Sequence, residues 1–120
     1  MADQIQVYLQ DDVEYEEDAV KKYVKDDSVR ERMRQLRDAL VAVDRFDVAS
    51  TEQALRALAD HLGVGAAKLI HPFRLALTGR SASPPIFDVV ALLGKPRTLQ
   101  RLDRFITRIP DLARSGTPAE

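Results

Sequence analysis

The spacing of apolar residues along the chain predicts a protein made of helices. Between residues 28 and 43, apolar side chains recur at alternating steps of four and three, which places them on one face of a helix. They are Val29, Met33, Leu36, Leu40 and Val43. Ser28 and Glu31 have the spacing of a capping box, so we expect this helix to begin at Ser28.

The same reasoning predicts five more helices. Their expected bounds are 14–25, 50–62, 66–78, 86–93 and 97–109. Ser50 and Gln53 form a second capping box, and Pro72 is expected either to kink its helix or to make it restart. Pro110 is expected to end the last helix, leaving residues 111–120 as a disordered tail. The predicted fold class is therefore all-α, a compact bundle of about six helices.

The stretch from Lys68 to Gly94 joins two strongly apolar runs through the polar turn GRSASPP. Ser83 is expected to cap the helix that follows, and Pro84 is expected to occupy its first position. Gly94 is expected to close the far end in the left-handed conformation. The pattern predicts two helices joined by a rigid turn that displays polar groups.

Charge is divided unevenly along the chain. Residues 1–27 contain nine acidic residues and three lysines, whereas residues 28–120 contain fifteen basic and ten acidic residues. A basic half beside an acidic end indicates a polyanionic partner, and the alternative is an ordinary solvated face. We expect the acidic segment to face away from such a partner.

The residues that usually carry catalysis or bind metals are scarce. The chain has no cysteine, and His61 and His71 are isolated from each other and from any nucleophile with a matched base. No His, Asp and Glu set has metal-ligand spacing, and no apolar stretch is long enough to span a bilayer. We interpret both histidines as structural and expect a cytoplasmic protein.

The central stretch resembles a known family. The strings HPFRLALTG, SPPIFDVVALLGK and RTLQRLDRFI are together similar to the C-terminal anticodon-binding region of bacterial glutamyl-tRNA synthetases, which are class I aminoacyl-tRNA synthetases. Weaker similarity extends back through DDVEYEEDAVKKY. The resemblance implies that residues 1–27 are the tail of a preceding helical domain. It also implies that residues 28–110 are the helical anticodon-binding domain.

The resemblance also implies a tRNA-binding site around residues 74–87. In this family, residues at five matching positions contact the first and second anticodon bases: Arg74, Ser83, Pro84, Ile86 and Phe87. An arginine offers five donors in a fixed geometry to a base edge, and apolar side chains can pack on the faces of unstacked bases. Five further arginines are candidate phosphate contacts: Arg80, Arg97, Arg101, Arg104 and Arg108.

Structural alternatives exist for these residues and for the function. Ile86 and Phe87 could belong to the core, and Arg74 could pair with Asp88. The arginines between residues 97 and 108 could form a solvated helix face. The alternative function is a helical protein–protein interaction domain that docks through its acidic N-terminal segment.

The resemblance sets the expected partner and cofactors. The partner is tRNA-Glu, with no role for DNA or a membrane, and the chain is expected to be a monomer. Full-length members of the family are ATP- and Mg-dependent ligases whose HIGH-like and KMSKS-like motifs lie in an N-terminal catalytic domain. Those motifs are missing from this chain, so we expect neither a cofactor nor catalysis in this fragment alone.

Overall fold

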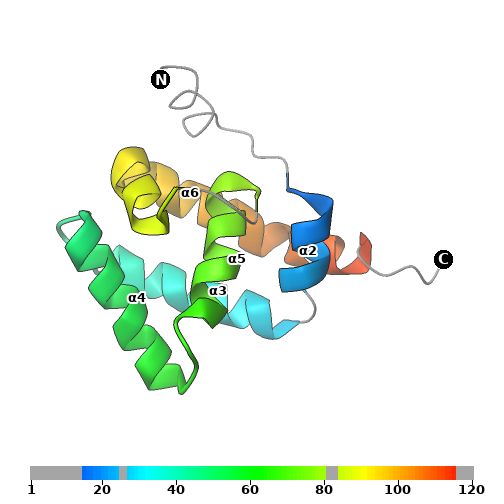
Figure 1. The fold of residues 1–120 in the computed structure, drawn as a ribbon, viewed down its shortest axis with the longest axis horizontal. Coiled ribbons are helices and arrows are strands. Elements are labelled where there is room, and N and C mark those ends of the chain that lie inside the picture. The colour runs from blue at the N-terminus through cyan, green and yellow to red at the C-terminus, as the bar shows by residue number, and fades with distance from the viewer. Residues whose placement is uncertain (1–14, 25–26, 81–83, 116–120) are drawn as a thin grey trace.

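Residues 15–24, 27–80 and 84–115 are described by the computed structural model, which places five helices among them (Figure 1). They are α2 (Glu17–Tyr23), α3 (Asp27–Val41), α4 (Val48–Leu62), α5 (Ala67–Thr78) and α6 (Ile86–Ser115). No strand occurs in these residues, which confirms the all-α prediction. The count is five rather than about six because the last two predicted helices are joined as α6.

A break inside α6 marks the place where those two predicted helices meet. Gly94 has φ 81° and ψ 168°, so its φ is positive as expected, but its ψ is extended rather than left-handed helical. The next residue ties the break to α3, because Lys95 Nζ donates to the carbonyls of Val41 and Val43, each at 2.7 Å. The positive charge of Lys95 therefore caps the C-terminal end of α3.

Pro72 and Pro110 lie inside helices instead of ending them. Pro72 lies within α5, which continues through it as one element without a restart. The prediction that Pro110 ends the last helix is wrong, because α6 continues to Ser115, and the predicted disordered tail is wrong for residues 111–115. A proline removes one backbone hydrogen bond, but the fully buried Ile109 beside it keeps this face of the helix packed.

The starts of α3 and α4 also differ from prediction. Helix α3 begins at Asp27, so Ser28 lies in its first turn. Helix α4 begins two residues before Ser50, and its N-cap is Asp47, whose carboxylate accepts from the Ser50 amide at 2.8 Å. Gly63 ends α4 in the left-handed conformation, directly after the expected last residue, 62. Both a serine and an aspartate can cap a helix, so composition alone did not choose between neighbouring candidates.

One hydrophobic core joins α3, α5 and α6, with α4 packed against α3 and α6. Its largest fully buried side chains include Met33 and Leu36 from α3, Phe73 from α5, and Leu102 and Phe105 from α6. The predicted apolar face of α3 therefore points inward. None of the described helices is long and apolar enough to cross a membrane.

Helix α2 belongs to the same core. Ala19, Val20 and Val24 are buried among the other core residues, where α2 packs against α5 and α6. Just before α2, the Glu16 amide donates to the Gly79 carbonyl at 2.6 Å. The core therefore extends across the predicted domain boundary at residue 28.

Candidate nucleic-acid interface

The turn after α5 is held by the Leu-Thr-Gly segment. Gly79 adopts the left-handed conformation, with φ 75° and ψ 5°, and its amide donates to the Leu75 carbonyl at 2.8 Å. Thr78 Oγ1 donates to the Arg74 carbonyl at 2.8 Å and accepts from the Arg80 amide at 3.1 Å. These bonds satisfy backbone groups that a helix end leaves open, so the turn leaves α5 in a defined direction.

On the far side of the turn, α6 begins at the expected bound of 86 and not at Pro84. Its first residue is Ile86, and the Pro85 carbonyl accepts from the Val89 amide at 3.2 Å, as an N-cap carbonyl does. Pro84 is exposed and lies before the helix, so its prediction as the first helical residue is wrong. Ser83, the predicted cap, lies outside the described residues.

Two of the predicted base contacts are core residues. Ile86 is 3% exposed and Phe87 is 8% exposed. A base that stacks on a side chain needs an open apolar face, and these two side chains offer almost none. Ile86 and Phe87 therefore do not offer their side chains for packing on a base, and their burial anchors the start of α6. The described turn leaves Arg74 half-buried, while Arg80 and Pro84 are exposed.

Arg101 is not positioned to contact a phosphate. Its residue is only 2% exposed, and its Nη1 donates to the Leu77 carbonyl at 2.7 Å. The bond joins α6 to the last turn of α5. The predicted phosphate contact is thus corrected to a structural link, which places a charged group where the α5 carbonyls carry partial negative charge.

The other arginines of this stretch do not form one exposed face. Arg108 is exposed and lies over the Tyr15 ring, with its guanidinium carbon 5.5 Å from the ring centroid. Arg97 and Arg104 are half-buried. Burial raises the pKa of Tyr15, and the nearby charges of Arg108 and Arg104 oppose that rise. Three of the four predicted arginines therefore retain accessible surface, and two of these lie near Tyr15.

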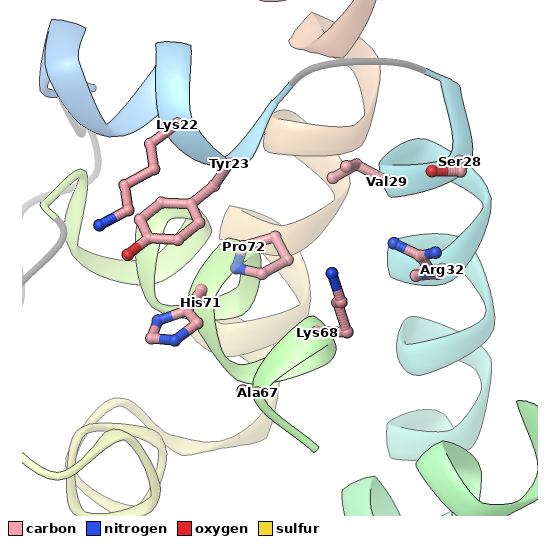
Figure 2. A pocket seen from close by; sticks show the side chains of 9 residues that line it. All are labelled: Lys22, Tyr23, Ser28, Val29, Arg32, Ala67, Lys68, His71 and Pro72. Atoms are coloured by element: carbon pink, nitrogen blue, oxygen red, sulfur yellow. The ribbon is translucent and has the colours of Figure 1, made fainter. Parts of the chain in front are cut away.

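A basic pocket lies between α2, α3 and α5, and the sequence pattern does not predict it. Its volume is about 470 Å³, and its basic side chains come from three helices: Lys22, Arg32 and Lys68 (Figure 2). The rings of Tyr23 and His71 stack beside it, with centroids 4.8 Å apart and planes 13° from parallel. No local run of charge marks the pocket, because its residues are far apart in the sequence.

Residues 1–106 match the family model described as anticodon binding domain. A glutamate–tRNA ligase from Desulforudis audaxviator is 42% identical over 104 residues, which cover 85% of this chain and 21% of that ligase. A glutamate–tRNA ligase from Thermoanaerobacter pseudethanolicus is 38% identical over 106 residues, which cover 88% of this chain and 22% of that ligase. The chain therefore spans about a fifth of the length of these relatives.

A solved structure has the same fold. The crystal structure of a glutamate tRNA ligase from Elizabethkingia meningosepticum, in complex with its amino acid, aligns with a TM-score of 0.79 at 25% identity. The alignment covers 87% of this chain and 20% of that protein. Because the family model spans most of the sequence and the fold recurs in a solved ligase, the chain belongs to the anticodon binding domain family.

Proposed function

We propose that the chain is the anticodon-binding part of a glutamate–tRNA ligase and that its partner is tRNA-Glu. The match of residues 1–106 to the anticodon binding domain carries this proposal, and the similar glutamate–tRNA ligases supply the choice of amino acid. A protein-interaction role through the acidic N-terminal segment has no comparable support. Part of that segment, α2, also places its apolar side chains in the core of this domain.

The turn between α5 and α6 is the proposed reading surface. Anticodon bases are unstacked, so polar groups can reach their edges. Arg74 offers a planar fork of donors to a base edge, and Arg80 offers an exposed positive charge to a phosphate. Ser83 and Pro84 remain proposed contacts within the turn. Ile86 and Phe87 act beneath it, because their buried side chains hold the start of α6 in place.

The proposal assigns binding, not catalysis, to this chain. In a longer ligase, ATP and Mg would take part in the activation of glutamate. We propose that such a ligase acts in the cytoplasm. Among the described residues, no group of three or more His, Cys, Asp or Glu side chains could hold a metal ion. We place the ATP and Mg chemistry in other parts of such a ligase because the resemblance assigns the HIGH-like and KMSKS-like motifs to an N-terminal catalytic domain.

Substitution of Arg74 tests the proposed site. If its guanidinium meets a base edge, Arg74→Ala should weaken tRNA-Glu binding by about 1–3 kcal/mol and reduce discrimination at one anticodon position. The measurement is the affinity for tRNA-Glu and for anticodon-substituted tRNAs at one fixed salt concentration. The matched control is Arg56→Ala on α4, where the exposed arginine pairs with Glu52.

Thermal unfolding of both variants separates binding from folding, because the stem of a half-buried arginine also packs. A folded Arg74→Ala variant that keeps full anticodon preference would show that Arg74 is structural. A wild-type chain with no preference for the glutamate anticodon would reject the proposed function itself.

A further inference from the structure

The basic pocket gathers positive charge from three helices. Lys22 comes from α2, Arg32 from α3 and Lys68 from α5. Figure 2 shows the head group of Lys68 between α5 and α3 and that of Arg32 in front of α3, while Lys22 extends past the Tyr23 ring and ends on the other side of it. None of the described lining residues is acidic. Like charges repel when they are brought together, and an anion that enters the pocket relieves that repulsion.

An anion in the pocket would contact side chains and not the backbone amides at the start of α5. The amides of Lys68, Leu69 and Ile70 already donate to the carbonyls of Gly65 and Ala66, at 2.9–3.0 Å. Those amides are therefore not open to a ligand, although the first turn of a helix is often an anion site. The charges of the pocket are on long side chains that can close around a ligand.

His71 adds an unsatisfied polar atom to the wall of the pocket. Its Nδ1 is buried and has no hydrogen-bond partner among the described residues. Burial lowers the pKa of His71, and the positive charges of Arg74 and Lys22 lower it further. A ring nitrogen without a partner is costly to keep buried. A shift of the His71 side chain toward the pocket would let the imidazole donate one N–H to an anion oxygen.

We propose that this pocket binds a phosphate group of the tRNA backbone, with Lys22, Arg32 and Lys68 as its charged contacts. The choice of RNA as the source of the phosphate rests on the proposed function. The pocket is larger than a phosphate needs, so it has room for the attached sugar. It lies at the N-terminal half of α5, and the proposed reading surface lies at the other end.

The distance between the two surfaces suits one RNA strand. Helix α5 has 12 residues, so its length is about 18 Å, which a few linked nucleotides can span. The pocket would fix the position of the strand without reading its sequence, as phosphate contacts do. This placement also revises the expectation that residues 1–27 face away from RNA, because Lys22 contributes to the phosphate-binding face.

The first experiment measures the His71 pKa by NMR in sodium phosphate and in sodium chloride at matched ionic strength. The charges that act on His71 are those of Arg74 on α5 and Lys22 on α2, and the ring of Tyr23 is stacked on it. Arg32 on α3 and Lys68 on α5 line the same pocket. A bound anion favours the protonated imidazole, so phosphate should raise the pKa. The double variant Arg32→Gln/Lys68→Gln should remove that response. An unchanged pKa in the wild-type chain would overturn the proposal.

The second experiment measures tRNA binding by the same double variant. The control is Arg34→Gln/Arg56→Gln, which removes two exposed arginines that each pair with an acid on their own helix. The pocket variant should weaken binding about tenfold or more beyond the control. It should also reduce the slope of the logarithm of affinity plotted against the logarithm of salt concentration. The reduction should be roughly 0.7 for each phosphate that the variant no longer neutralises. Thermal unfolding checks that both variants are folded.

The outcomes separate this proposal from the proposed function. If the pocket variant binds tRNA like the control, the phosphate proposal is wrong, even if inorganic phosphate shifts the His71 pKa. If the wild-type chain binds all tRNAs alike and the pocket variant binds them all more weakly, anticodon reading is rejected and the phosphate site stands. Weaker binding with unchanged anticodon preference supports both.

Discussion

Arg101 occupies an unusual position for a charged residue, because only 2% of it is exposed. Removing a guanidinium from water is costly, and its hydrogen bond to the Leu77 carbonyl offsets part of that cost. Among the candidate phosphate contacts, this hydrogen bond identifies Arg101 as a support for the turn. Its effect on RNA binding would be indirect, through the C-terminal end of α5.

Arg101→Met should therefore act on stability. The substitution keeps an unbranched apolar stem but leaves a carbonyl at the end of α5 without its partner. We expect the free energy of unfolding to fall by about 1–3 kcal/mol. Arg34→Met, at an exposed position on α3, should change it by no more than about 0.5 kcal/mol. Urea unfolding measures both, and an equal effect of the two substitutions would contradict the structural role.

At the scale of elements, the path of α6 depends on one glycine. Gly94 has φ 81° and ψ 168°, a combination that is essentially limited to glycine. Lys95 then reaches the end of α3 from the residue that follows. Two residues of the Leu-Leu-Gly-Lys motif thus have structural reasons to be a glycine and a lysine.

Gly94→Ala should be costly although there is room for the added methyl group. An ideal Cβ at Gly94 meets no atom within 4 Å, and the same holds at Gly65, where φ is not positive. A comparison of alanine substitutions at these two glycines therefore measures backbone strain without a contribution from steric contact. We expect Gly94→Ala to lower the free energy of unfolding by about 1–3 kcal/mol and Gly65→Ala to leave it unchanged or raise it slightly. Equal denaturant midpoints for the two variants would exclude strain at Gly94.

The N-cap of α4 should make stability depend on pH in the acid range. Hydrogen bonds from Ser50 hold the pKa of Asp47 below its ordinary value of 3.8. The unfolded chain therefore binds this proton more readily than the folded chain. The contribution of Asp47 is complete above that ordinary value and is lost as pH falls through the lowered pKa of the folded state.

Asp47→Asn keeps an oxygen that can cap the helix but removes the titration. The difference in Tm between the wild-type chain and this variant should stay constant from about pH 8 to about pH 5 and change below about pH 4, as the wild-type chain loses its advantage. Thermal unfolding across this range is the measurement. A difference that stays constant to the lowest pH would show that the carboxylate is not the responsible group.

At the scale of the whole molecule, α2 is part of the fold although it lies in the acidic segment. Val20 and Val24 are 5% and 3% exposed, and they pack in the same core as α5 and α6. The helix also supplies Lys22 to the basic pocket. The acidic side chains that α2 does carry, Glu17 and Asp18, are exposed.

Removal of residues 1–26 should therefore destabilise the domain. Each buried valine contributes about 1.5–3 kcal/mol, so the shortened chain should lose about 3 kcal/mol or more of its free energy of unfolding. Urea unfolding of the full and shortened chains compares them, and the m value reports the change in buried surface. An unchanged free energy of unfolding would instead support a domain boundary near residue 28.

The sequence by itself determined the helical class, the inward face of α3 and the glycine that ends α4. These features follow from local rules, since a repeat of 3.6 residues and a left-handed glycine need no distant partner. The resemblance of strings within residues 71–106 to a family, which the family match supports, added the prediction that Arg74 belongs to a binding site.

Only the tertiary structure decided between two roles that the same side chain can have. Ile86 and Phe87 can pack on a base or in a core, and an arginine can face a phosphate or a carbonyl. What packs against them comes from distant parts of the chain: Arg101 bonds a carbonyl 24 residues away, and Lys95 bonds one 52 residues away. The basic pocket likewise exists only because α2, α3 and α5 meet. Local periodicity carries no information about contacts between distant helices, since these contacts depend on how the whole chain packs.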